Sequence, residues 1–133
     1  MSRQESLIHI AALILLASVT WLSCSEDKKG VDPNNNPPVI QSITADPDTF
    51  YAGPGHYTTV TVMATDPDGD VLQYQWEARK LERKGGQGNT VMLEACDCEI
   101  SVPTNDIVIA TVRDGRGGEA LDSVSVHILP AEE

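Results

Sequence analysis

The stretch DPDGDVLQYQW, Asp66–Trp76, joins a turn rich in carboxylates to a segment in which every second residue is apolar. Its apolar residues are Leu72, Tyr74 and Trp76, and glutamines lie between them. A period of two is the pattern of a strand with one buried face. The aspartates, proline and glycine before it are turn-forming residues. The stretch therefore predicts a turn followed by a half-buried strand, and it favours an all-β fold.

The chain from residue 37 onward repeats this alternation of strands and turns. The predicted strands are Val39–Ala45, Tyr57–Thr65, Leu72–Ala78, Thr90–Ala95, Glu99–Val102, Ile107–Arg113 and Gly118–Leu129. Arg79–Asn89 is expected to be a basic, Gly-rich turn region. Seven short strands at regular spacing predict one β-sandwich over residues 37–130. Its core is expected around Val60, Val62, Tyr74, Trp76, Val108, Val112, Val124 and Val126.

The composition is strongly acidic, with 20 Asp and Glu against 9 Lys and Arg and a net charge of −11. Binding to nucleic acid depends on clustered Lys and Arg that neutralise phosphates, so this charge argues against nucleic acid as a partner. Anionic membrane surfaces are disfavoured for the same reason. The acidity serves solubility, or it provides a site for a divalent cation.

Residues 1–23 are predicted to be a targeting segment. The apolar run Leu7–Leu22 is short for a membrane-spanning helix and suits a secretory signal. It ends at Ser23-Cys24, which resembles the lipobox of bacterial lipoproteins, although Trp21 and Leu22 depart from the usual residues. Three interpretations stay open: a lipoprotein signal with lipidation at Cys24, an uncleaved anchor, or an ordinary signal with an incidental cysteine. All three export the chain.

Residues 24–36 are polar, rich in Asn and Pro and without periodicity, which predicts a flexible tether. Ser25 directly after the cysteine resembles the signal for outer-membrane sorting in many diderm bacteria. More than one acyl chain on Cys24 would make a stable anchor. We therefore expect an extracytoplasmic protein, lipid-anchored to the cell envelope, with the membrane as one partner.

Three runs of sequence carry a resemblance to a known family. They are NNNPPVIQSITADPD, TVTVMATDPDGDVLQYQW and VRDGRGGEALDSVSVHIL. Together they resemble the PKD and related cadherin-like modules of bacterial surface proteins, over nearly the whole of Pro37–Leu129. The middle, Cys96–Asn105, departs from the family pattern. The resemblance implies an immunoglobulin-like sandwich that serves as a spacer, adhesion or binding module.

Asp66, Asp68 and Asp70 occupy every second position, a spacing that calcium loops use. An EF-hand is excluded, because the required glycine is missing and a strand follows instead of a helix. In an immunoglobulin-like sandwich the turn at Asp114 lies at the same end as this turn. Asp114 could then complete an oxygen-rich calcium site. The alternative is that these residues only form turns and cap local N–H groups.

Cys96 and Cys98 form the motif Cys-x-Cys. In an exported chain with Cys24 lipidated, they are the remaining pair in an oxidising compartment. The alternatives are a disulfide between them, free thiols or an intermolecular bond, and a metal or redox site. Metal binding lacks support, because no second cysteine pair and no histidine stand nearby at ligand spacing.

Arg79, Lys80, Arg83 and Lys84 form a basic run around Glu82. It is either a solvated hairpin tip that discourages edge-to-edge pairing or a patch for an anionic partner, a protein or a polysaccharide. Strand directions counted from the N-terminus place the carboxylate turns at the tethered end and the basic tip at the outer end.

An enzyme is not expected, because the sequence has no nucleophile elbow, P-loop or zinc-protease helix. We expect a membrane-anchored, non-catalytic binding or adhesion module outside the cytoplasm. The alternative is a structural or accessory lipoprotein of an envelope assembly, stiffened by calcium.

Overall fold

A computed structural model describes residues 32–132, except residues 97 and 99. The signal segment and Cys24 lie outside the described residues. The described part contains eight strands and no helix, so it has no helix of the length and apolarity that a membrane span requires. The strands are β1 (Val39–Asp46), β2 (Thr49–Tyr51), β3 (Tyr57–Thr65), β4 (Gln73–Glu77), β5 (Leu81–Gly85), β6 (Thr90–Ala95), β7 (Thr104–Arg113) and β8 (Glu119–Leu129).

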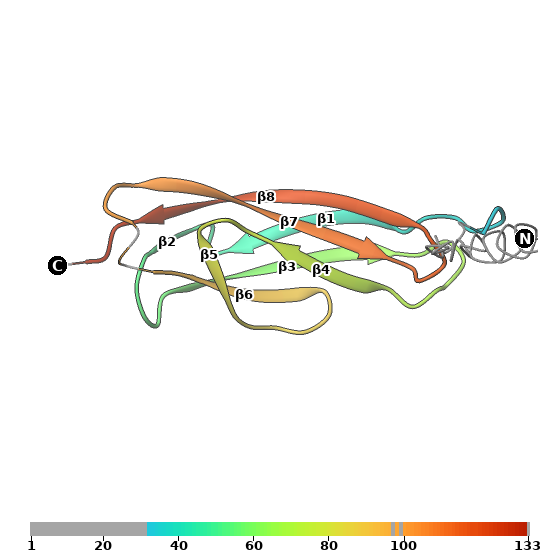
Figure 1. Ribbon diagram of the computed structural model, residues 1–133, viewed down its shortest axis with the longest axis horizontal. Coiled ribbons are helices and arrows are strands. Elements are labelled where there is room, and N and C mark those ends of the chain that lie inside the picture. Colours follow the sequence, from blue (N-terminus) through green and yellow to red (C-terminus); the bar gives the residue numbers. More distant parts are fainter. Residues whose placement is uncertain (1–31, 97, 99, 133) are drawn as a thin grey trace, which may run out of the picture.

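Two four-stranded sheets form a sandwich, with the orders β1-β3-β6-β5 and β2-β8-β7-β4 (Figure 1). All pairings are antiparallel except that of β2 with β8, which is parallel. This division of strands is that of an immunoglobulin-like fold. The predicted all-β sandwich is thus confirmed.

The predicted number of seven strands is wrong, because β2 and β5 were not predicted and the strand expected up to Val102 does not form. β2 arises because the first strand is divided between the two sheets. β1 pairs with β3 in one sheet, and β2 pairs with β8 in the other. A cis peptide bond, Asp46–Pro47, lies between them. The hydroxyl of Thr58 donates to the carbonyl of Pro47 at 2.6 Å, and the N–H of His127 donates to the carbonyl of Asp48 at 2.7 Å. The first strand therefore crosses from one sheet to the other at Pro47 and Asp48.

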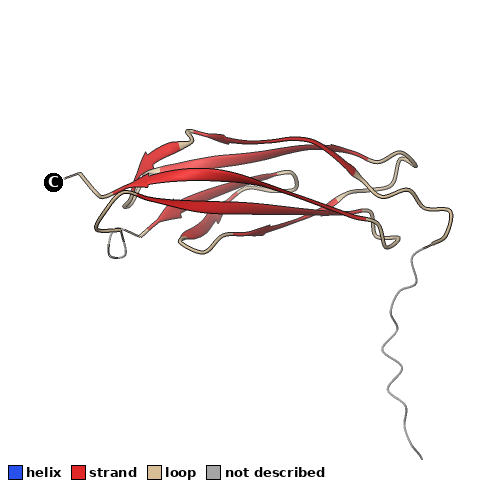
Figure 2. Cartoon of the chain, turned by 90° about the horizontal axis from the view of Figure 1, so that it is seen from above, coloured by secondary structure: helices blue, strands red, loops and turns tan. Residues whose placement is uncertain are grey.

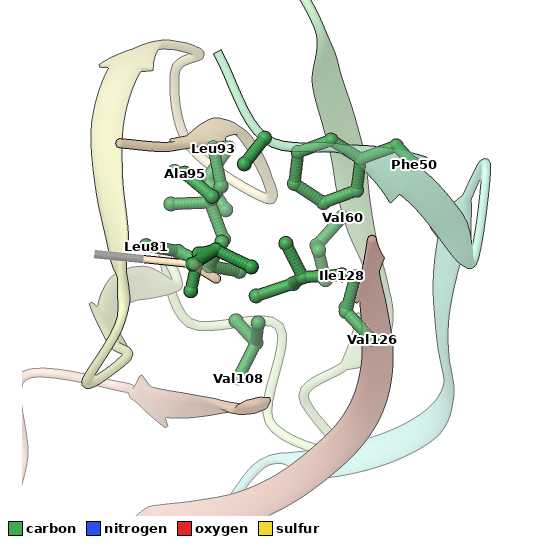
Figure 3. Packing of buried hydrophobic residues seen from close by; sticks show 11 residues of the cluster. Phe50, Val60, Leu81, Leu93, Ala95, Val108, Val126 and Ile128 are labelled. Atoms are coloured by element: carbon green, nitrogen blue, oxygen red, sulfur yellow. The ribbon is translucent and has the colours of Figure 1, made fainter. Parts of the chain in front are cut away.

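The core follows the alternation in the sequence. Fully buried residues include Val60, Val62, Val108, Val112 and Val126, as expected. Three further expected core residues, Tyr74, Trp76 and Val124, are only half-buried and pack against the margin of the core. Buried residues outside the expected core include Phe50, Leu81 and Ile100. Figure 3 shows Phe50 beside Val60 and Ile128 in this cluster.

Two expectations about the middle of the chain are wrong. Arg79–Asn89 is not only a turn, because it contains β5, which pairs with β6 at the edge of its sheet. Leu81 anchors this strand in the core, while its charged residues face solvent, as edge strands permit. The expected strand Glu99–Val102 does not form: Ile100–Val102 is loop, and the burial of Ile100 holds this loop against the core.

The strands run along the long axis of the molecule (Figure 2). The turn between β3 and β4 and the turn between β7 and β8 lie at the end where the chain enters (Figure 1). Arg79 and Lys80, between β4 and β5, lie toward the opposite end, whereas Arg83 and Lys84 lie along the edge strand β5. The carboxylate turns and the basic residues Arg79, Lys80, Arg83 and Lys84 are therefore separated along the sandwich.

Candidate functional site

The Asp66–Asp70 turn gathers three carboxylates. One carboxylate oxygen of Asp66 accepts the N–H groups of Asp68 at 2.9 Å and of Asp70 at 3.1 Å. Gly69 adopts a φ of 78°, in the left-handed region that favours glycine. The chain therefore folds around the Asp66 side chain, and one oxygen from each of Asp66, Asp68 and Asp70 lies within 4.8 Å of the others.

The second turn, Asp114–Gly118, is built in the same way. One carboxylate oxygen of Asp114 accepts the N–H groups of Arg116 at 2.7 Å and of Gly118 at 2.9 Å. Asp114 is only 5% exposed. It is not one of the three clustered carboxylates, but the Arg116 side chain of the same turn lies 3.0 Å from Asp70, so the two turns face each other. Both turns thus use an aspartate as their organising acceptor.

The segment Asp32–Asn36, which the sequence suggests is part of a tether, contacts both turns. Asn36 donates its backbone N–H and its side-chain amide to the two carboxylate oxygens of Asp68, at 2.7 and 3.0 Å. The Asn35 amide donates to the second oxygen of Asp114 at 2.6 Å. We call Asp32–Asn36 the entry segment. It is the third component of the site, and sequence reasoning missed it.

Gly118 makes the close approach of the entry segment sterically feasible. A Cβ at this position would lie 2.8 Å from the Cα of Pro37 and 3.0 Å from the Asn35 amide nitrogen, and it would overlap the Asp114 carboxylate. Any side chain here would therefore displace the entry segment or the second turn.

Hydrogen bonds keep two carboxylates of the site ionised. The bonds from Asn36 lower the pKa of Asp68 below its ordinary value, and the nearby charge of Arg116 lowers it further. The bond from the Asn35 amide is the largest cause of the lowered pKa of Asp114, followed by the bonds from the Arg116 and Gly118 N–H groups. At neutral pH the site therefore has concentrated negative charge.

Three oxygens of the site are buried and have no hydrogen-bond partner among the described residues. They are Oδ2 of Asp66, Oδ2 of Asp70 and Oδ1 of Asn35. Buried polar atoms in native proteins nearly always have a partner. Carboxylate and amide oxygens are the ligands that Ca²⁺ takes in proteins. The donor set of this site thus suits a hard divalent cation.

Cys96 and Cys98, at the end of β6, are joined by a disulfide with an Sγ–Sγ distance of 2.08 Å. The pair lies toward the end of the sandwich opposite the carboxylate turns, because β6 runs away from them. It takes no part in the site at the entry end.

The basic run has contacts within the molecule. The Lys84 Nζ lies 3.2 Å from a carboxylate oxygen of Glu94 and 3.4 Å from one of Glu82. The Arg83 guanidinium donates to the carbonyl of Gly86 at 2.7 Å, and the Lys80 Nζ donates to the Thr104 hydroxyl. Because of these contacts, the positive charges of the basic run lie along β5 and beside the residues that pair with them, and they do not gather at one point.

Asp106 was not predicted, and it organises the corner between β4 and β5. It is 4% exposed, and one of its oxygens accepts the N–H groups of Arg79 at 3.0 Å and of Lys80 at 2.7 Å. On β7 its side chain faces the core, as those of Val108 and Ala110 do. This alternation was the signal in the sequence, because a carboxylate that faces the core must accept hydrogen bonds from nearby N–H groups.

No protein-family model matches the chain, and no curated protein matches it. A solved structure described as PcdhgB3 EC1-4, a protocadherin ectodomain, is similar over 74% of this chain and 26% of its own length. The sequence identity is 18% and the TM-score is 0.43. The chain therefore spans about a quarter of the length of that structure. The assignment of the site rests on its own residues.

Proposed function

We propose that the chain is an exported, lipid-anchored, non-catalytic binding or adhesion module whose entry end binds Ca²⁺. The observation that carries the calcium site is a set of three buried oxygens that have no partner within residues 32–132 as described; the entry segment and the Asp66–Asp70 turn contribute them. These oxygens lie among carboxylates that hydrogen bonds keep ionised. The anchor rests on the N-terminal segment and Cys24, and the PKD-like character rests on the sequence runs quoted above.

Calcium fits this donor set better than magnesium or a transition metal. Ca²⁺ accepts six to eight oxygen ligands in irregular geometry, whereas Mg²⁺ requires a nearly ideal octahedron. Transition metals favour imidazole or thiolate ligands, and the clustered donors are carboxylates. Extracellular modules commonly bind calcium with dissociation constants of about 0.1–1 mM, and we expect the same range here.

The cation would act on the joint between the tether and the sandwich. Asn35 and Asn36 come from the entry segment, while the aspartates come from turns that the sandwich holds in place. A shared ion therefore adds a link between the two parts. Its role is mechanical: it fixes the direction in which the module projects from its anchor.

Calcium titration of the full chain in a nonionic detergent tests this function. We expect calorimetry to show saturable binding at about 0.1–1 mM and the melting temperature to rise with calcium. Asp66→Asn and Asp70→Asn should abolish both effects, because each removes a clustered carboxylate. Asp122→Asn, an exposed substitution on β8, is the matched control and should leave both unchanged. Absence of binding up to several millimolar calcium would contradict the proposal.

A further inference from the structure

We propose that Arg116 is a built-in competitor for the cation: its guanidinium offsets part of the negative charge of the carboxylate cluster when calcium is absent, and calcium displaces it. This inference rests on the proposed calcium site and concerns its regulation. Arg116 lies in the second turn, and its Nε is 3.0 Å from Oδ1 of Asp70 in the first turn. Its side chain therefore spans the two turns.

The backbone of Arg116 is held in place while its side chain stays in solvent. Its N–H donates to the Asp114 carboxylate at 2.7 Å, and its carbonyl accepts the N–H of Asp32 at 3.4 Å. The Arg116 side chain is 59% exposed, whereas that of Asp70 is 15% exposed. A fixed backbone with an exposed side chain allows the guanidinium to leave without disturbing the turn.

The ion pair leaves the cluster only partly neutralised. Arg116 contacts Oδ1 of Asp70, while Oδ2 of Asp70 and Oδ2 of Asp66 have no partner among the described residues. One positive charge therefore faces the three carboxylates of Asp66, Asp68 and Asp70. A divalent cation at these oxygens brings twice the charge and contacts more of them.

Calcium and the guanidinium cannot both occupy this place. Two like charges a few ångströms apart repel, and the repulsion is strongest in a partly buried site. Moving Arg116 away is easy, because exposed ion pairs contribute little to stability. The pair therefore weakens calcium binding, while in calcium-free solution it partly offsets the repulsion among the carboxylates.

The test compares Arg116→Gln with Arg113→Gln in the full chain. Both substitutions remove one positive charge near the same end of the sandwich. Arg113 pairs with Glu119 at 2.6 Å and donates to Gln75 at 2.7 Å, so its side chain is engaged away from the cluster. It therefore controls for the long-range effect of net charge.

Calorimetric titration with calcium chloride at fixed ionic strength gives the affinities. We expect Arg116→Gln to bind calcium about two- to fivefold more tightly than the unchanged chain, the factor that corresponds to an exposed ion pair. Arg113→Gln should change the affinity less. In EDTA, Arg116→Gln should melt at a lower temperature than the unchanged chain, because the carboxylates then lack their cation.

The outcomes separate this inference from the proposed function. Binding by the unchanged chain with equal or weaker binding by Arg116→Gln overturns the inference and leaves the calcium site standing. An equal gain for Arg113→Gln also overturns it. Calcium binding by Arg116→Gln but not by the unchanged chain would support the competition, and it would overturn calcium binding as a function of the unchanged chain. Absence of binding by every variant overturns both.

Discussion

Two aspartates in or beside β7 perform the same task at opposite ends of the sandwich. Asp106 accepts backbone N–H groups from the connection between β4 and β5, and Asp114 accepts them from the turn that leads into β8. Both residues are almost fully buried. A charged acceptor forms stronger hydrogen bonds than a neutral one. Each aspartate therefore fixes a connection that would otherwise be free to move.

The lowered pKa values of Asp68 and Asp114 give the stability a defined pH dependence. In the unfolded chain both carboxyls titrate at about 3.9, so protons bind the unfolded state first as the pH falls. The stability that these groups contribute is complete above that ordinary pKa and is lost as the pH falls through the lower pKa of the folded state. We expect ¹³C NMR titration of the side-chain carboxyls to show both midpoints below 3.9.

Asn36→Ala should raise the pKa of Asp68 toward its ordinary value, because the side-chain bond from Asn36 is one of its two largest causes. The remaining bond from the Asn36 backbone should keep the change partial. Asp114, whose main donor is Asn35, should change less and serves as the internal control. An Asp68 that already titrates at its ordinary pKa in the unchanged chain would contradict the assignment.

Turn chemistry and strand direction were sufficient to predict that the aspartates of the two turns lie at the same end of the sandwich, but not that asparagines contact them. Asp66, Asp68 and Asp70 are neighbours in sequence, and the immunoglobulin-like connectivity places Asp114 at the same end. Asn35 bonds to a residue 79 positions away, and Asn36 to one 32 positions away. Such contacts leave no periodic signal in a polar, Asn-rich segment.

The two strands that were not predicted from the sequence, β2 and β5, are both edge strands. β2 has three residues, too few to show a period of two, and only Phe50 among them is buried. β5 has a single buried residue, Leu81, before a run of charged ones. The long strands β3, β7 and β8 were predicted because each repeats buried positions several times. Short edge strands are held by one buried side chain and by backbone hydrogen bonds to the neighbouring strand. Neither produces a periodic pattern in the sequence.

Phe50→Ala should therefore detach β2 from β8. Phe50 is 6% exposed, and removing such a buried ring costs about 3–4 kcal/mol of the free energy of unfolding. Urea denaturation measures this loss. Hydrogen exchange should also show faster exchange of the amides of Ala52 and His127, which bond to Leu129 and Asp48.

The adjacent Tyr51→Ala provides the comparison, because Tyr51 is exposed and points away from the core. It should cost less than about 1 kcal/mol. Equal losses for the two substitutions would show that β2 is not anchored through Phe50.

The entry segment is hydrogen-bonded to the sandwich as part of the folded domain. A fragment that begins at Pro37 loses the donors of Asn35 and Asn36, whereas one that begins at Asp32 keeps them. We expect the shorter fragment to melt about 5 °C lower, the shift that corresponds to losing a few exposed hydrogen bonds in a domain of this size. It should also bind calcium more weakly.

The double substitution Asn35→Ala, Asn36→Ala in the longer fragment should reproduce most of this loss, because it removes the two side-chain donors and leaves the chain length unchanged. Differential scanning calorimetry compares the three proteins. Identical melting of the two fragments would mean that the entry segment contributes nothing to the fold.

The parallel pairing of β2 with β8 has a consequence for resistance to force. The chain enters at the end where β8 begins, and β8 ends at the opposite end of the molecule (Figure 1). A pull between the entry segment and the residues after β8 draws β1 and β2 toward one end and β8 toward the other. The backbone bonds between β2 and β8 are then loaded in shear and share the tension. Rupture requires them to fail together, so the sandwich resists stretching along its length better than peeling of an edge strand.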